Sequence, residues 1–179
     1  KGFRGLVLHL GRRFSDIQVK DNTIRAQAGA MLTTVARTAW EHALTGMEFA
    51  TGIPGTVGGA VVMNAGAYDG EMKQVVQTVT VLSESGEIME LSNNSMQFSY
   101  RNSIIKNRPF IVLETEFSLQ EGNADEIRAK MDDFNERRRS KQPLEYPSAG
   151  STFKRPEGYF AGKLIMDAGL RGYSIGGAQ

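Results

Sequence analysis

The sequence predicts an α+β fold in two parts, and three observations support this expectation. The chain has 179 residues, of which 40% are hydrophobic and 23% charged, as is typical of one ordinary globular domain or two small ones. Segments with strand-type alternation are interspersed with segments whose apolar residues recur at helical spacing. Pro143 and Pro147 mark a linker, so we expect one domain over residues 1–140 and the start of a second over residues 141–179.

Strands are predicted from alternation, from apolar runs and from the turns between them. Residues 5–10 form a nearly continuous apolar run, which is typical of a buried strand. Turn residues at 20–22 and at 84–86 each separate two such segments, which predicts hairpins. The strands are expected at residues 5–10, 14–19, 23–28, 75–82, 87–91 and 110–119.

Two helices are predicted by apolar residues three or four positions apart. The first covers residues 32–44 and is expected to end at Gly46, because glycine readily terminates a helix. The second is a short amphipathic helix over residues 160–168, ended by Gly169 or Gly172.

A further helix is predicted to begin at Asn123. This side chain can cap the first turn, and Glu126 follows three residues on, which is a helix-start signature. The helix runs into the basic residues 137–141. Its apolar face consists of Ile127, Met131 and Phe134.

Composition excludes several classes of function. The chain has no cysteine, which excludes disulfides and thiolate chemistry, and only two histidines, so we expect no metal site. The net charge of +1 gives no reason to expect a nucleic-acid partner. There is no run of about 18 apolar residues and no signal peptide, so we expect a cytoplasmic protein without a membrane span.

Seven of the twenty glycines lie between Gly46 and Gly70. Glycine lets backbone N–H groups approach a ligand closely, and successive N–H groups can bind an anion. The segment is neither a Walker loop nor a Gly-x-Gly-x-x-Gly fingerprint. Two interpretations stay open from these residues: a loop that cradles a ligand, or a tight crossing of two backbone segments.

Three further segments carry candidate chemistry, each with a plainer alternative. Arg101 lies among small polar and aromatic residues, where it either stabilises a developing negative charge or pairs with a surface carboxylate. Ser151 is either a hydroxyl proton donor or part of an ordinary turn. Six Lys and Arg residues against one acidic residue lie between Arg137 and Arg155. They suit either a phosphate-bearing small molecule or the solvated end of a helix.

Taken together and in this order, these segments resemble one family. Residues 52–60, 64–68, 99–103, 149–154 and 162–178 are similar to the motifs of the bacterial UDP-N-acetylenolpyruvoylglucosamine reductases. The resemblance covers essentially the whole chain. It implies an FAD-binding domain of the vanillyl-alcohol-oxidase (PCMH) type and a smaller α+β substrate-binding domain. It matches the form that lacks an inserted tyrosine-bearing loop, and we expect both ends to be truncated relative to the family.

The resemblance also implies an activity in peptidoglycan synthesis, and hence in cell-wall biogenesis, cell shape and cell division. FAD is reduced by NADPH and delivers hydride from N5 to C3 of UDP-N-acetylglucosamine enolpyruvate. A proton then reaches C2 to give UDP-N-acetylmuramate. The implied partner is this small molecule, with no nucleic acid, metal or membrane, and we expect a monomer.

The same resemblance assigns roles to individual residues. Arg101 matches the arginine that stabilises the developing enolate, and Ser151 matches the serine that protonates C2. The positions that match substrate contacts are Tyr68, Arg137, Lys141 and Lys154. The positions that match the cofactor-binding segments are Gly52, Ile53, Pro54, Gly55, Thr56, Gly58, Gly59, Asn64, Ala65, Gly66 and Ala67.

Two other functions stay open at this point. One is an FAD-dependent oxidase of the same superfamily. The other is a non-catalytic nucleotide-binding fragment, which would keep the glycine loop and the basic residues but would not need Arg101 or Ser151. The glutamate that helps to organise protonation in the family is expected outside this sequence.

Overall fold

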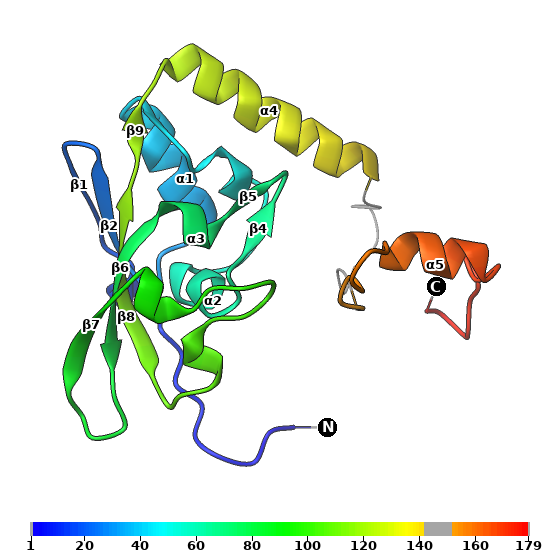
Figure 1. The fold of residues 1–179 in the computed structure, drawn as a ribbon, viewed down its shortest axis with the longest axis horizontal. Helices are drawn as coiled ribbons and strands as arrows, with labels where there is room; N and C mark the ends of the chain where they lie inside the picture. Colours follow the sequence, from blue (N-terminus) through cyan, green and yellow to red (C-terminus); the bar gives the residue numbers. More distant parts are fainter. Residues whose placement is uncertain (1, 142–151, 179) are drawn as a thin grey trace. The chain divides into compact units, whose positions relative to one another are not determined.

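The computed structural model describes residues 2–141 and 152–178, and the chain divides into two compact units, residues 1–141 and 142–179. In the first unit, antiparallel strands form a sheet with the order β1-β2-β8-β6-β7 (Figure 1). The strands of this sheet are β1 (Ile17–Lys20), β2 (Thr23–Gln27), β6 (Val76–Leu82), β7 (Ile88–Ser92) and β8 (Ile111–Ser118).

Short strand pairs and helices complete the described part of the chain. The short antiparallel pairs are β3 (Leu44–Thr45) with β9 (Gln120–Glu121), and β4 (Gly66–Ala67) with β5 (Gly70–Glu71). The α-helices are α1 (Leu32–Glu41), α2 (Val57–Val62), α3 (Met72–Val75), α4 (Ala124–Lys141) and, in the second unit, α5 (Ala161–Asp167). The 3-10 helices are η1 (Arg12–Phe14), η2 (Glu48–Ala50), η3 (Asn94–Met96) and η4 (Ile104–Lys106).

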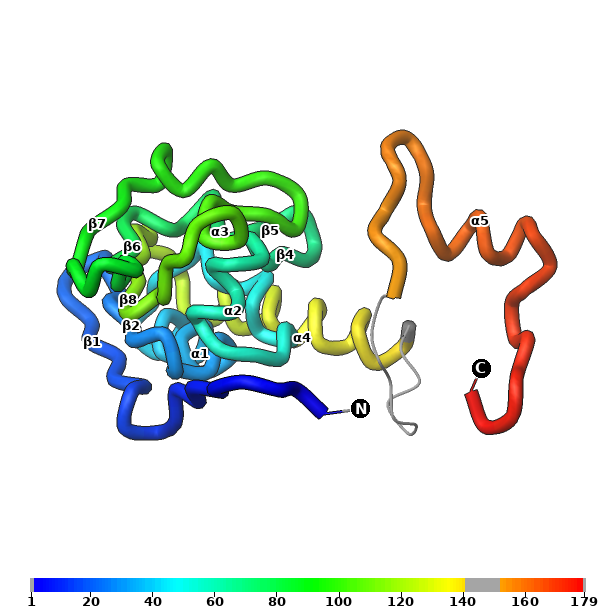
Figure 2. The backbone as a smooth tube through the Cα atoms, turned by 90° about the horizontal axis from the view of Figure 1, so that it is seen from below, coloured from blue at the N-terminus to red at the C-terminus, as the bar shows by residue number. Residues whose placement is uncertain are grey.

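The core of the first unit lies between one face of the sheet and the helices α1 and α2, which Figure 1 shows on the same side. Ile24 and Ala26 of β2 are fully buried, and so are Val79 of β6 and Phe117 of β8. Residues two apart on a strand share a face, so the alternation in the sequence selects this face for burial. The smooth backbone trace in Figure 2 shows α1 and α2 against the sheet from a second direction.

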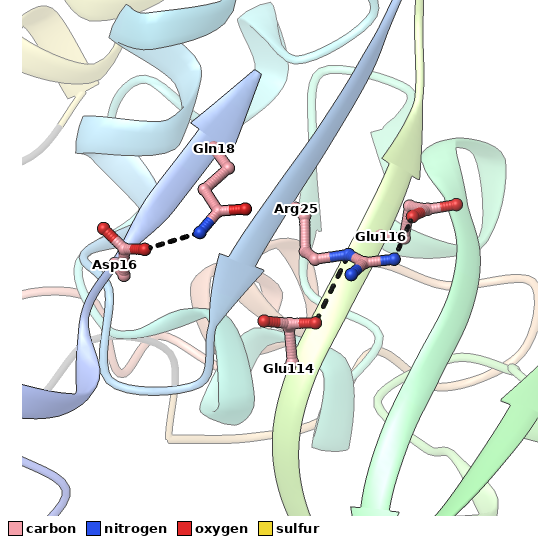
Figure 3. Close-up of polar contacts among 5 residues, drawn as sticks. All are labelled: Asp16, Gln18, Arg25, Glu114 and Glu116. Atoms are coloured by element: carbon pink, nitrogen blue, oxygen red, sulfur yellow. Dashed lines mark hydrogen bonds and ion pairs between the residues drawn. The ribbon is translucent and has the colours of Figure 1, made fainter. Parts of the chain in front are cut away.

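The opposite face of the sheet is polar. Arg25 of β2 lies between two carboxylates of β8, with its guanidinium 3.0 Å from Glu116 and 3.4 Å from Glu114 (Figure 3). Beside it, the Gln18 amide donates a hydrogen bond to Asp16. Exposed ion pairs of this kind contribute about 0.2–1 kcal/mol. They therefore mark the solvent face rather than hold the fold together.

Most of the predicted elements are confirmed, and the helix ends have local causes. The first helix ends at Glu41 rather than near Gly46, because Ala43 takes a left-handed conformation (φ 54°) and Leu44 begins β3. The Asn123 side chain accepts hydrogen bonds from the N–H groups at the start of α4, as predicted for its cap. The predicted apolar face of α4 is buried as well, at Ile127, Met131 and Phe134.

The predicted buried strand at residues 5–10 is wrong. The segment has no regular secondary structure and runs as an extended tube in Figure 2. Leu6, Val7 and Leu8 are 82%, 71% and 69% exposed. An apolar run is buried only when a second surface covers it, and nothing in residues 2–141 and 152–178 covers this one.

Candidate functional site

The start of α2 is tied to the connection between β2 and α1. The N–H of Val57 donates to the carbonyl of Ala30, and the N–H of Gly58 donates to that of Ala28, each at 2.9 Å. An antiparallel bridge joins Met31 to Thr56. These N–H groups therefore bind the protein itself, so any anion held by the predicted glycine loop has to use its other N–H groups.

The glycines between Gly46 and Gly70 differ in what surrounds them and in their backbone conformation. A methyl group on Gly58 would lie 3.0 Å from the Ala28 side chain, and one on Gly70 would lie 2.6 Å from Phe49, so these two are tight crossings. Gly55 has φ +131°, which side chains rarely adopt. At Gly59 the nearest atom to such a methyl group is 3.8 Å away, so the protein's own packing does not explain this glycine.

Asn64 is almost completely buried and links three parts of the chain. Its amide NH2 donates to the Glu71 carboxylate at 3.0 Å and to the Ser99 carbonyl at 3.2 Å, and its amide oxygen accepts from the Lys73 N–H at 2.9 Å. The two N–H donors and the oxygen of this amide therefore all have hydrogen-bond partners within the protein. Its place in the predicted cofactor segment is explained by holding that segment against the loop that carries Arg101.

Arg101 lies at the tip of a tight turn. Ser99 and Asn102 exchange two backbone hydrogen bonds, so the residues between them form a two-residue loop in which Arg101 has φ 54°. The buried hydroxyl of Ser103 donates to the carbonyl of Val62, at the end of α2. The turn is therefore fixed to α2, and the structure brings together three segments that the sequence had marked separately.

Backbone strain is concentrated in this region. Among the described residues, seven other than glycine have positive φ, and four of these are Asn64, Tyr68, Asp69 and Arg101. Such conformations cost of the order of 1–3 kcal/mol each and persist where the surroundings enforce them, often at functional sites. The strain therefore supports a functional interpretation of these turns, independently of their sequence.

The predicted substrate contacts have different surroundings. The Tyr68 ring stacks on the Phe134 ring of α4, with centroids 4.5 Å apart. Arg137, on the same helix, pairs with Asp133 at 2.7 Å and is half exposed. Lys154 is exposed in the second unit. The Lys141 side chain and Ser151 lie outside the described residues.

A buried carboxylate lies between Gly46 and Gly52, the first two glycines of the cluster. Glu48 accepts hydrogen bonds from the Thr45 hydroxyl at 2.6 Å and from the Gly46 N–H at 2.8 Å, and Lys130 of α4 lies 3.6 Å away. Burial raises the pKa of Glu48, but these hydrogen bonds and the nearby ammonium outweigh it, so the pKa is lowered overall. The charged carboxylate therefore holds η2 in place.

A pocket of about 420 Å³ opens beside the glycine loop, within the usual volume of ligand sites. Of its lining, only Thr56 was predicted as a site residue. The other lining residues could not be predicted, because the bridge that joins Met31 to Thr56 connects segments whose local sequence patterns do not reveal the contact. The pocket is lined by His9, Leu10, Gly11, Arg12, Ser15, Ile17, Gly29, Met31, Thr34 and Thr56.

The described residues form neither a metal site nor a membrane span. In residues 2–141 and 152–178, no three His, Asp or Glu side chains come together as a metal site. Over the same residues, no helix has the length and apolar character that crossing a membrane requires.

Comparison with known proteins gives the class of the first unit. The family model "FAD binding domain" matches residues 1–92, which include the glycine loop, Asn64 and Tyr68. The chain therefore contains an FAD-binding domain. A second family model, the C-terminal domain of UDP-N-acetylenolpyruvoylglucosamine reductase, matches residues 142–179.

Individual relatives identify the family more narrowly. UDP-N-acetylenolpyruvoylglucosamine reductase from Caldanaerobacter subterraneus is 58% identical over the whole chain, and that from Clostridioides difficile is 53% identical over 99% of it. The chain spans 59% of the length of each. The crystal structure of the enzyme from Thermus caldophilus matches 89% of this chain and 58% of its own, with TM-score 0.78 and 34% identity. The chain belongs to the UDP-N-acetylenolpyruvoylglucosamine reductase family.

Replacing Asn64 with Asp is expected to lower the free energy of unfolding by about 1–3 kcal/mol, because two donated hydrogen bonds become contacts between acceptors. Chemical denaturation measures the effect. Asn107→Asp, at an exposed position, is the matched control and is expected to change stability by less than about 0.5 kcal/mol. Equal effects at both positions would contradict the role given to Asn64.

Glu48→Gln is expected to destabilise the chain at neutral pH, because it removes a charged acceptor of two hydrogen bonds. Since the pKa of Glu48 is lowered on folding, its contribution is complete well above the ordinary value of 4.5 and is lost as the pH falls below it. The stability difference between the two proteins, measured by denaturation across pH, should therefore shrink in acid. Glu84→Gln, at an exposed position, is the matched control and is expected to change stability at neutral pH by less than about 0.5 kcal/mol.

Proposed function

We propose that this sequence is part of an enzyme that uses FAD and NADPH to reduce UDP-N-acetylglucosamine enolpyruvate to UDP-N-acetylmuramate in the cytoplasm. The relatives carry the name UDP-N-acetylenolpyruvoylglucosamine reductase over 99% or more of this chain. Because the chain spans 59% of their length, the complete reaction is proposed for a polypeptide of that length. We expect the enzyme to act as a monomer.

One observation supports this proposal most directly. Asn64 and Ser103 fix the Arg101 turn to α2 and to the segment that follows the glycine loop. Residues that are separate in the sequence are thereby held in one rigid region, which also has the strained backbone typical of functional sites. A chain that only bound a nucleotide through its glycine loop would have no need to hold an arginine there.

The residues around the glycine loop fit the cofactor. Gly59 leaves open space where a side chain would project, and the pocket beside the loop reaches Thr56 and Met31. In this proposal Gly55, Thr56 and Gly59 would hold part of FAD, with Arg12 supplying positive charge at the pocket. The chemistry that bound FAD supplies is hydride transfer, from NADPH to the enolpyruvyl carbon C3.

In this proposal, residues of the chain stabilise the negative charge of the enolate and supply the proton that C2 takes up. Addition of hydride at C3 leaves negative charge on the enolate, and in this proposal the guanidinium of Arg101 stabilises that charge. Ser151 gives its hydroxyl proton to C2, which completes the reduction. The two backbone hydrogen bonds between Ser99 and Asn102 fix the backbone position of Arg101, and its guanidinium carbon lies 5.3 Å from the centroid of the Tyr100 ring.

A size series at Gly59 tests whether FAD covers this part of the loop. In a polypeptide of the relatives' length that contains this sequence, Gly59→Leu is expected to weaken FAD binding at least tenfold, and Gly59→Ala to weaken it less. Folding stability should be kept, because the position is exposed and helical. Flavin titration and thermal unfolding are the two measurements.

Gly58→Ala is the matched control for this series. It is expected to lower stability by about 1–3 kcal/mol, because the added methyl group meets Ala28. If Gly59→Leu bound FAD as tightly as the unmodified protein, the loop would not contact the cofactor and this part of the proposal would fail.

Ser151→Ala separates the two half-reactions in the same full-length polypeptide. Reduction of the flavin by NADPH should stay within twofold, while formation of UDP-N-acetylmuramate should fall at least about 100-fold, because general-acid catalysis typically contributes that much. Stopped-flow flavin absorbance and product chromatography measure the two steps. Ser148→Ala is the control at a nearby hydroxyl. If both half-reactions stayed intact in Ser151→Ala, Ser151 would not be the proton donor.

The alternatives give different results in the same assays. An oxidase of the same superfamily would reoxidise its flavin rapidly with oxygen and turn over an alcohol, and a nucleotide-binding fragment would turn over neither substrate. Turnover of the enolpyruvyl substrate by a protein without flavin would also overturn the proposal.

A further inference from the structure

Tyr68 is held in an uncommon conformation. It forms, with Asp69, the two-residue loop between β4 and β5, and both residues have positive φ, at 52° and 63°. Hairpin loops of this kind strongly favour asparagine and glycine, because a large side chain is disfavoured at positive φ. The sequence nevertheless has a tyrosine there, so its ring serves a purpose other than forming the turn.

The surroundings of the hairpin enforce this conformation. The backbone at Gly70 lies against Phe49, so closely that a methyl group there would be 2.6 Å from it. The Gln74 amide donates to the carbonyl of Asp69 at 3.2 Å. These contacts fix the backbone of the loop, but they leave the direction of the Tyr68 ring to be set by what it touches.

The Tyr68 ring touches Phe134 of α4. The two rings are nearly parallel, at 11°, with centroids 4.5 Å apart, and Phe134 is itself 8% exposed. Stacking at this separation is a favourable arrangement of aromatic rings. The guanidinium carbon of Arg137 lies 5.9 Å from the centroid of the Phe134 ring, within the range of a cation–π contact. Phe134 thus contacts two residues predicted to bind substrate.

The helix that carries Phe134 is fixed on both sides of it. Lys130 pairs with the buried carboxylate of Glu48, and the Asn135 amide donates to the Thr51 hydroxyl at 3.3 Å. These two contacts hold α4 against the first unit on either side of Phe134. Phe134 provides a fixed surface that sets the plane of the tyrosine ring.

We propose that Phe134 is a positioning residue for the nucleotide-sugar substrate, which orients the Tyr68 ring by stacking and holds Arg137 beside it. The inference rests on the proposed function and adds a residue to the substrate side of the same site. Phe134 acts through Tyr68 and Arg137, so its loss should weaken substrate binding and leave the chemistry and the cofactor unaffected.

Kinetics on a polypeptide of the relatives' length test this inference. Phe134→Leu keeps an apolar side chain but removes the stacked ring, and it is expected to raise KM for UDP-N-acetylglucosamine enolpyruvate at least fivefold, with kcat and FAD affinity within twofold. Phe134→Tyr keeps an aromatic ring, so its KM is expected to equal that of the unmodified protein. Met131→Leu, at a buried position one turn earlier on α4, is the control and should leave KM unchanged.

The outcomes separate this inference from the proposed function. An unmodified protein that binds no FAD or does not turn over the substrate overturns the proposed function itself. Normal turnover with an unchanged KM in Phe134→Leu overturns only the inference, and so does an equal rise of KM in Met131→Leu. If Phe134→Leu and a second variant, Phe134→Met, both failed to fold, Phe134 would be a structural residue and the inference would be wrong.

Discussion

The buried amide of Asn64 is the interaction on which the rest of the site depends. Only an amide side chain offers two donors and an acceptor at once, and here these reach Glu71, Ser99 and Lys73 in three different segments. Because these bonds lie away from water, each is strengthened by the low dielectric constant and would be costly to leave unmade. The Arg101 turn and the β4–β5 hairpin therefore keep their relative positions through a single side chain.

The local sequence pattern was sufficient to predict most helices and strands, because the spacing of apolar residues directly reflects which face of an element is buried. It failed at residues 5–10, where burial depends on a covering surface that the described residues do not supply. It also missed the end of α1, where Ala43 is left-handed and the next residue begins β3, which pairs with the distant β9. Both failures concern contacts between segments that are distant in the sequence.

In the candidate site, too, local motifs could be predicted from the sequence but contacts between distant segments could not. Its motifs were found from the sequence, but the glycine cluster could not be interpreted until each position had neighbours. Gly58 and Gly70 are explained by close packing against Ala28 and Phe49, whereas the protein's own packing does not explain Gly59. Phe134 was expected to be core, and its contact with Tyr68 brings together residues 66 positions apart, which no local pattern reveals.

The contacts of α4 with the rest of the first unit restrict the length of this helix. Trp40 donates to the carbonyl of Ala124, and Lys130 and Asn135 bind further along the same helix. An α-helix turns by about 100° per residue. One inserted residue within this stretch would rotate everything after it away from its partners. An inserted or deleted residue in the middle of α4 is therefore expected to cost these contacts, so the partners of the helix set the number of residues that it can hold between Ala124 and Asn135.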